Sequence, residues 1–369
     1  YLTEIVNSVP SSSNITYYGT LVQKKHMMRR LIEASDHISQ IGYDENKELE
    51  EMLDNAEKKL FDVTNFNTAH KFVPIKDELT EAWERLDRLH TEGDGLRGIP
   101  TGFKDIDIKL SGLQKSDLII LAARPSVGKT SFALDIARQA AVNHNIPVGI
   151  FSLEMSSQQL VDRMLAAQAN VDAWKLRTGK LSRQDDFEAI RESLDKLNKA
   201  PIFIDDQPGN NILKMRSIAR RLKSEHGLGL IVVDYLQLMV PTQTKNDNVV
   251  QQVTEISRSL KNLARELDCP VLALSQLSRA VEQRGGRPRL SDLRDSGSIE
   301  QDADVVMFIH REDKYKDESE RTNIAEILIE KHRNGETGKV ELFFNDKKAT
   351  FQNMDKSQYG GADKEFSDF

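Results

Sequence analysis

Short apolar runs alternate with longer helical stretches from about Thr101 onward, and this alternation dominates the hydrophobic pattern of the chain. The runs are "DLIILAA", "VGIFSL", "PIFIDD", "LIVVDY", "VLALSQ", "DVVMFI", "AEILIEK" and "KVELFFN". Continuous Val, Ile and Leu runs separated by helices are typical of a mostly parallel sheet that is covered on both faces. The last two runs are close enough in sequence to pair as a C-terminal hairpin. The pattern therefore predicts an α/β domain over residues 95–369.

The N-terminal residues follow a helical pattern instead. Residues 14–62 predict two helices, and the second has apolar positions at helical spacing, namely Leu49, Met52, Leu53, Ala56 and Leu60. Two helices bury too little apolar surface to fold alone. We therefore expect this partial all-α domain, residues 1–62, to pack against preceding sequence, against a neighbouring copy, or both. The chain opens on Tyr1 without a basic-then-apolar leader, so we expect missing N-terminal sequence and not a secreted protein.

Residues 63–94 predict a linker that carries one short helix. The segment "DVTNFNTAHKFVPIK" is polar and aperiodic. The following "DELTEAWERLDRLH" has one apolar face, formed by Leu79, Ala82, Trp83, Leu86 and Leu89. A helix this short is marginal by itself in water, so the face must dock, on its own domain or on a neighbouring subunit. At the other end of the chain, we expect the polar tail from Lys356 to fray.

Charge and cysteine content narrow the class of protein. The single cysteine, Cys269, excludes an intrachain disulfide and fits a reducing compartment, so we expect a cytoplasmic protein. The apolar runs are far too short to span a membrane, and no membrane partner is expected. The net charge of −7 argues against a uniformly basic surface, but a local basic strip can still bind nucleic acid.

The stretch "ARPSVGKT", residues 123–130, resembles a phosphate-binding loop that has lost its first glycine to Ala123. An apolar strand precedes it and a helix follows it, which aims backbone N–H groups and the positive end of the helix at a phosphate. We expect Lys129 to contact the β- and γ-phosphates of ATP and Thr130 to ligate Mg²⁺. The predicted nucleotide contacts are Ser126, Gly128, Lys129, Thr130 and Ser131. The alternative is a chance Gly-Lys-Thr at the start of a helix.

Polar residues end three further strands, where ligands of open α/β sheets bind. Asp234 follows four apolar residues and is predicted to hold Mg²⁺ directly or through water. Its next residue is Tyr235 and not Glu, so the base for the attacking water must lie elsewhere, and Glu154 is the candidate. Gln276 is predicted to sense the γ-phosphate. For any one of these carboxylates taken alone, a helix cap is the alternative.

Together these residues lie in motifs that resemble the DnaB-type replicative DNA helicases. The matching stretches are "ARPSVGKTSFALDIA", "IFSLEMSSQQLVDRML", "LRTGKL", "IVVDYLQL", "EISRSLKNLARELDCPVLALSQLSR", "DLRDSGSIEQDADVVMFI" and "EKHRNG". The resemblance spans residues from about 95 to 350 and implies a RecA-like core, with Ala commonly replacing the first glycine of the loop. It also implies a homohexamer in which ATP lies between two subunits.

By this resemblance, Lys331 and Arg333 of one subunit reach the γ-phosphate bound by its neighbour, with Arg333 as an arginine finger. The residues themselves agree with this resemblance: on a strand, the side chains of residues 331 and 333 point to the same face, continuing from Ile327 and Ile329. The alternative is that they are two solvated charges at a strand end.

The segment "LSRAVEQRGGRPRLSDLRDSGS", residues 277–298, is the predicted DNA-binding segment. It holds Arg279, Arg284, Arg287, Arg289 and Arg294 against Glu282, Asp292 and Asp295. The resemblance maps backbone contacts of the DNA onto Arg294, Asp295 and Gly297, although many family members have Glu where this chain has Asp295. The segment contains no aromatic residue, so we expect sequence-independent and salt-sensitive recognition of phosphates. The alternative is a flexible surface loop with Gly285 and Gly286 at its middle.

The resemblance implies an ATP-driven motor that moves 5′→3′ along single-stranded DNA and unwinds duplex at the replication fork. Family members bind primase through an N-terminal collar and are placed on DNA by a helicase loader. Two alternatives remain from the residues themselves. One is a RecA-like recombinase filament, and the other is a nucleotide-gated adaptor without enzymatic activity.

Overall fold

The computed structural model describes residues 15–43, 96–181, 184–209, 211–239, 249–278, 280–293, 297–315 and 320–354, together with single helical positions between 52 and 87. The chain divides into two compact units, residues 1–87 and 88–369, and each is described by itself. Among the helices of these residues, none combines the length and the apolar character needed to cross a lipid bilayer.

The N-terminal unit contains the long helix α2, Ile15–Gly42. The described positions beyond it that are helical, as the pattern predicts, are Met52, Asn55, Ala56, Lys59 and Leu60. Val63 is also helical, although the pattern predicts that it belongs to the linker. In the predicted docking helix, Leu79 and Trp83 are helical and exposed. Ala82, Leu86 and Leu89, most of the predicted linker and the tail from Lys356 lie outside the described residues.

Nine strands of the described residues form one sheet in the order β3-β2-β4-β5-β1-β6-β7-β8-β9. The strands are β1 (Leu118–Ala123), β2 (Val148–Ser152), β3 (Ile202–Asp205), β4 (Leu230–Asp234), β5 (Val271–Gln276), β6 (Val305–His310), β7 (Ile324–His332), β8 (Gly338–Asn345) and β9 (Thr350–Asn353). The first six strands in this order pair in parallel, and β6 to β9 pair antiparallel. The predicted parallel sheet and the β7–β8 hairpin are therefore confirmed.

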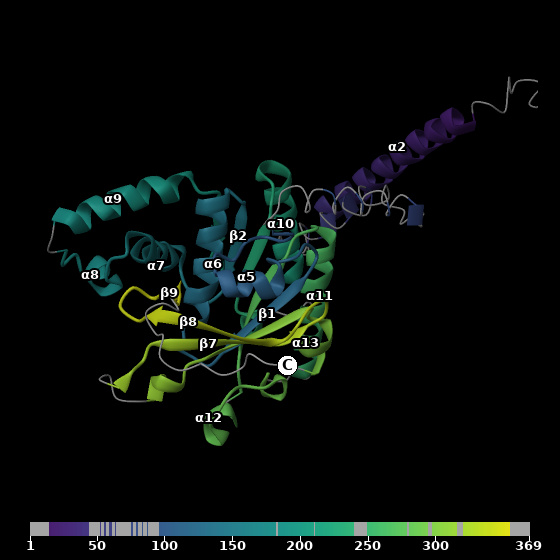
Figure 1. Ribbon diagram of the computed structural model, residues 1–369. Helices are drawn as coiled ribbons and strands as arrows, with labels where there is room; N and C mark the ends of the chain where they lie inside the picture. Colours follow the sequence, from purple (N-terminus) through teal and green to yellow (C-terminus); the bar gives the residue numbers. More distant parts are fainter. Residues whose placement is uncertain are drawn as a thin grey trace, which may run out of the picture. The chain divides into compact units, whose positions relative to one another are not determined.

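Helices cover both faces of this sheet, as Figure 1 shows for the C-terminal unit. One face is covered by α5 (Lys104–Leu110), α6 (Lys129–His144) and α7 (Ser157–Ala169). The other is covered by α10 (Ile212–His226), α11 (Val249–Glu266) and α13 (Gly297–Asp302). Further out lie α8 (Ala173–Thr178) and α9 (Gln184–Lys199), and the short helix α12 spans Ala280–Arg284. The described residues also form the 3-10 turns η3 (Leu236–Leu238), η4 (Leu290–Asp292) and η5 (Glu312–Tyr315).

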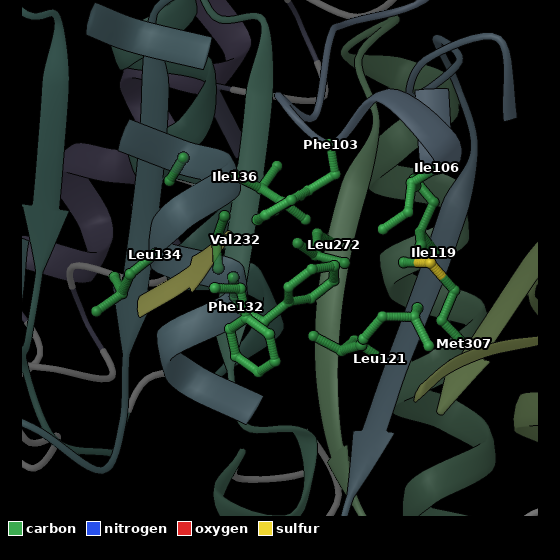
Figure 2. Close-up of a cluster of buried hydrophobic side chains, with 14 of the residues drawn as sticks. Phe103, Ile106, Ile119, Leu121, Phe132, Leu134, Ile136, Val232, Leu272 and Met307 are labelled. Carbon is green, nitrogen blue, oxygen red and sulfur yellow. The ribbon is translucent and has the colours of Figure 1, made fainter. Parts of the chain in front are cut away.

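Phe132 anchors the first turns of α6 in the core between the sheet and the helices (Figure 2). Its ring is fully buried, stacks on Phe103 at 5.0 Å and meets the edge of Phe351 at 5.2 Å between centroids. Removing such a ring costs about 3–5 kcal/mol. Because Phe132 lies only a few residues after Lys129, this packing fixes the start of α6 against the sheet.

Strand β9, which the sequence pattern does not predict, is held to α6 by a buried carboxylate. Asp135 accepts hydrogen bonds from the Phe351 N–H at 2.7 Å and from Thr350 Oγ1 at 2.9 Å, and it pairs with Arg138 at 2.9 Å. Burial raises the pKa of Asp135, and these partners partly offset the rise. A fully partnered carboxylate is the arrangement that buried charges require. It brings the last strand of the sheet against the helix that carries Lys129.

A β-bulge changes the predicted geometry of β7. Val306 pairs with Lys331 and the next residue, Met307, pairs with Ile329, so Glu330 is the extra residue. A bulge of this kind reverses which face the following side chains occupy. Lys331 therefore shares the face of Val306, opposite to Ile329, and Arg333 lies in the turn after the strand. The prediction that both basic residues continue the face of Ile327 and Ile329 is wrong.

Candidate functional site

The loop between β1 and α6 has the backbone geometry of a phosphate site. Gly128 caps α6 with φ 109°, a conformation that side chains other than glycine avoid. A Cβ at this position would lie 2.9 Å from the Phe351 ring, so packing also demands glycine. Ser126 has φ 62° and reverses the chain just before it. The N–H groups at the start of α6 are thereby left to face an anion.

Lys129, Thr130 and Asp234 meet at the carboxyl ends of β1 and β4. The Thr130 hydroxyl donates to Asp234 Oδ2 at 2.7 Å, and Lys129 Nζ lies 3.9 Å from Asp234 Oδ1. The same Nζ lies 4.4 Å from the centroid of the Tyr235 ring, within range for a cation–π contact. Asp234 is buried, and its Oδ1 accepts no hydrogen bond from the described residues.

The orphaned Asp234 oxygen and the adjacent Thr130 hydroxyl fit a divalent cation. Carboxylate and hydroxyl oxygens are the ligands that Mg²⁺ takes in nucleotide sites. Burial raises the pKa of Asp234, partly offset by Lys129 and Thr130. Burial likewise lowers the pKa of Lys129, partly offset by Asp234 and Glu154. Both groups are thus held with little water around them, where a bound ion or phosphate interacts strongly.

A cavity of about 250 Å³ collects the predicted nucleotide residues. Its lining includes Ser126, Gly128, Lys129, Thr130 and Ser131, together with Glu154 and Gln276. Glu154 lies two residues beyond β2, and β4 and β5 stand between β2 and β1 in the sheet. Arg163, on α7, also lines the cavity. Arg163 could not be predicted from the sequence, because a single charge within a helical pattern carries no local signal of what it faces.

Lys331 and Arg333 lie at the opposite end of the parallel strands. Lys331 Nζ donates to the carbonyls of Glu300 at 2.5 Å and Ala303 at 2.7 Å. Arg333 Nε lies 3.6 Å from Asp304 Oδ1, and its guanidinium donates to the Gln301 carbonyl at 3.2 Å. The residues that supply these partners lie at the C-terminal end of α13 and in the short connection to β6.

Asp304 connects this basic pair to the amino end of β1. Its Oδ2 accepts from the Leu118 N–H at 2.8 Å and from Lys261 Nζ at 2.5 Å, and its carbonyl accepts from the Arg333 N–H at 2.8 Å. The strand β1 begins at Leu118, and the phosphate loop follows its last residue. Six extended residues span about 20 Å. Within one chain, Arg333 and Lys129 are therefore separated by the length of a strand.

The arginine-rich segment, residues 277–298, is closed at its base and tied to acidic residues. Leu277 and Leu293 form an antiparallel bridge. Inside it, both terminal nitrogens of Arg284 donate to the Asp292 carboxylate at 3.0 and 2.7 Å. Burial alone would raise the pKa of Asp292, but hydrogen bonds from Arg284 and from the Arg289 N–H outweigh it and lower the pKa.

Of the other residues predicted to bind DNA, the structure describes Arg287, Arg289 and Gly297. Arg287 donates through two nitrogens to Glu326 of β7, both at 2.7 Å. Its side chain is still 59% exposed, and that of Arg284 39%, so both present surface to solvent. Arg289 is exposed, and Gly297 begins α13. Arg279, Arg294 and Asp295 lie outside the described residues.

Comparison with known proteins decides the family. The family model for the DnaB-like helicase C terminal domain matches residues 98–353. The chain belongs to the DnaB helicase family. It is 49% identical over 357 residues to the replicative DNA helicase DnaB of Geobacillus stearothermophilus, covering 96% of this chain and 78% of that protein. It is 48% identical over the same length to the replicative DNA helicase DnaC of Bacillus subtilis (strain 168), with the same coverage of both chains.

Solved structures agree with this assignment to the DnaB family. One solved ATPase domain superimposes with a TM-score of 0.72 at 36% identity and covers 77% of this chain and 100% of its own. A DnaB-like replicative helicase, solved in a study of its interactions with primase, has a TM-score of 0.78 at 32% identity, covering 96% and 83%.

This DnaB-type chain is thus a replicative DNA helicase with a RecA-like core, a nucleotide-dependent ATPase that binds DNA. The predicted helicase function is confirmed, and the recombinase and adaptor alternatives are set aside.

Proposed function

We propose that this helicase hydrolyses ATP at interfaces between the subunits of a homohexameric ring and uses the energy to move 5′→3′ along single-stranded DNA. The observation that carries the proposal is the placement of Lys129 and Arg333 at opposite ends of β1. A single chain holds both halves of an ATPase site but cannot bring them together. A neighbouring copy must therefore supply the second half.

In the first half, the P-loop residues bind ATP, and Thr130 and Asp234 hold Mg²⁺. The bound ion supplies charge neutralisation at the β- and γ-phosphates. Lys129, desolvated and 3.9 Å from Asp234, is placed for the same oxygens. Glu154 lines the cavity and acts as the base that orients and deprotonates the attacking water. Gln276, at the end of the strand paired with β1, senses whether the γ-phosphate is present.

In the second half, Lys331 and Arg333 of the next subunit approach the same γ-phosphate. Arg333 is 53% exposed and lies 3.6 Å from Asp304, so its guanidinium is accessible to a neighbouring subunit. An arginine supplied in this way stabilises the charge that spreads over the transferring phosphoryl group and is worth about 10³–10⁵ in turnover. Lys331, with its ammonium bound to carbonyls at the end of α13, orients the turn that carries Arg333 and adds positive charge.

The arginine-rich segment binds the phosphates of the DNA backbone. The proposed contacts are Arg279, Arg284, Arg287, Arg289, Arg294, Asp295 and Gly297. Of these, Arg284 and Arg287 bind acidic partners while much of each side chain stays exposed, which suits a contact that must form and release. Binding through phosphates is independent of base sequence and weakens steeply with salt. Each subunit would release its grip after hydrolysis.

Partners follow from the same comparison. The related helicase studied with primase aligns with 96% of this chain, and we propose that this protein also binds primase and is placed on DNA by a helicase loader in the cytoplasm. The proposed domains are a partial helical collar domain at 1–62, a linker with its docking helix at 63–94 and the ATPase at 95–369. Leu79 and Trp83 are exposed, as a helix that docks on a neighbouring subunit requires.

Three substitutions test the proposal in the full chain. Lys129→Ala should abolish turnover of ATP, with or without single-stranded DNA. Arg333→Ala should bind a fluorescent ATP analogue normally but fail to hydrolyse ATP, and Arg294→Ala should mainly weaken binding to a labelled oligonucleotide. DNA-stimulated ATPase at the normal rate in Arg333→Ala would refute the shared site.

A further inference from the structure

Arg124, the residue after Ala123 in the phosphate loop, turns its side chain toward the arginine-rich segment and not along the loop. Its Nε donates to Glu282 Oε1 at 2.8 Å, and its NH1 donates to the Leu277 carbonyl at 2.8 Å. The side chain is only 12% exposed. An ion pair with one well-buried partner is less screened by solvent than a surface pair. Arg124 is thus held firmly between the two regions.

Arg124 also stands in the wall between two cavities. It lines the nucleotide cavity beside Lys129, and it lines a second cavity of about 470 Å³ beside Val281 and Glu282. In the part of the chain that the structure describes, no other residue lines both cavities. The Leu277 N–H donates to the Ala123 carbonyl at 3.2 Å, which adds a backbone link at the same place. The first two residues of the loop therefore contact the base of the segment directly.

The part of the arginine-rich segment between Leu277 and Leu293 forms one closed unit. The Leu277–Leu293 bridge closes it, and the Arg284–Asp292 pair crosses its interior. Glu282 lies on α12, inside this closed unit. A displacement of the phosphate loop that is passed to Glu282 would therefore reach the closed part of the segment, which carries Arg284 and Arg287, and not a single side chain.

We propose that the Arg124–Glu282 ion pair couples nucleotide binding to DNA binding, so that it sets how strongly a bound nucleotide changes the affinity for single-stranded DNA. This rests on the proposed roles of the phosphate loop and the arginine-rich segment. Because ATP would bind at this loop, a shift of the loop backbone on binding would be passed by the Arg124 side chain to α12. Arg124 and Glu282 act here as positioning residues, since neither has to touch the reacting atoms.

The experiment measures a coupling factor in the full chain. The affinity for a fluorescent oligothymidylate is measured with and without a non-hydrolysable ATP analogue and Mg²⁺, and the ratio of the two is the factor. Coupling between two binding sites is reciprocal, so the affinity for the analogue with and without oligothymidylate must give the same factor. Typical factors are about 5 to 150.

In Glu282→Gln we expect the coupling factor to fall to within about twofold of one, while the ATPase rate without DNA stays unchanged. Arg124→Gln should lower the factor at least as far, because it also removes the hydrogen bond to the Leu277 carbonyl. The double variant should lower the factor no further than Arg124→Gln, because the two residues share one ion pair. The matched control is Glu312→Gln, which removes an equal charge from the same second cavity and should keep the wild-type factor.

If Glu282 acts only as a surface charge, Glu282→Gln will change the affinity for DNA equally with and without the ATP analogue. The coupling factor would then be unchanged, which would overturn the proposal. So would additive effects of the two single variants. A wild-type factor of one would overturn both this proposal and the proposed function. A normal wild-type factor retained in Glu282→Gln would overturn this one alone.

Discussion

The separation of Arg333 from the phosphate loop of its own chain predicts that two inactive variants restore each other. Arg333→Ala keeps an intact Lys129, and Lys129→Ala keeps an intact Arg333. In a mixed ring, a site is complete where the loop comes from an Arg333→Ala subunit and the arginine comes from a Lys129→Ala neighbour. With equal random mixing, half of the loops and half of the arginines are intact, so about one quarter of the sites are complete.

We expect Arg333→Ala to lower the ATPase rate far more than it lowers the stability of the fold. The side chain is 53% exposed and its nearest carboxylate oxygen lies 3.6 Å away. Asp304 is buried but keeps Lys261 as its charge partner and the Leu118 N–H as a donor. Removing the half-exposed Arg333 side chain therefore leaves no unpaired buried charge and should cost about 1 kcal/mol of stability. An arginine finger contributes about 10³-fold or more to turnover, which is about 4 kcal/mol of barrier. The variant should therefore fold and assemble normally while losing nearly all hydrolysis.

The assay uses the two variants co-expressed with different tags and purified over both, so that every ring contains both kinds of subunit. Each variant alone should show background ATPase in the presence of single-stranded DNA, and the mixed rings should regain up to about one quarter of the wild-type rate. A matched control mixes Arg333→Ala with the Lys129→Ala/Arg333→Ala double variant, where no site is complete. Mixed rings that assemble but stay at background would show that Arg333 serves its own subunit.

Two further predictions concern the nucleotide site, and a third concerns Asp117, which immediately precedes β1. Gly128→Ala should lower the melting temperature and abolish nucleotide binding, because φ is 109° and the new Cβ would meet the Phe351 ring at 2.9 Å; a normal titration with a fluorescent ATP analogue would contradict this. Thr130→Val should weaken Mg²⁺-dependent nucleotide binding, since it removes the hydroxyl bonded to Asp234, whereas Thr130→Ser should restore it in a Mg²⁺ titration. Burial raises the pKa of Asp117 from 3.8 to about 6, so the folded chain holds this proton more tightly than the unfolded chain and stability falls as pH rises through that window. Asp117→Asn should therefore flatten the melting temperature between about pH 4 and 6 and raise it at about pH 7.5.

The parallel sheet and the phosphate loop could be predicted because their signals are local. Strand β4 is four apolar residues and an aspartate, and the loop is a fixed spacing of Gly128, Lys129 and Thr130 between a strand and a helix. Since the carboxyl ends of parallel strands share one edge, Glu154 and Gln276 could also be assigned to the same site without knowledge of the strand order. The loop residues, Glu154 and Gln276 line one cavity, and the buried Asp234 bonds to Thr130 at its wall.

What the sequence could not provide depends on contacts between distant residues. The bulge at Glu330 arises from the pairing of β6 with β7, and no feature of "EKHRNG" alone specifies it. The pairs Arg284–Asp292 and Arg287–Glu326 form only once the segment folds back on itself and on β7. Strand β9 is four residues long and depends on Asp135 of α6, far away in the chain. Tertiary structure overrides or completes the local pattern at each of these places.

The position of β1 has a consequence for the number of working motors in an assembly. Each copy carries the phosphate loop at one end of the strand and Arg333 at the other. With the shared site proposed above, a row of copies with two free ends leaves one loop and one arginine without a partner. Closing the row recovers that last site, and the relative gain is largest when the row is short. The ATPase rate per subunit should therefore rise when the row closes into a ring. A rate measurement alone could then report ring closure, without imaging.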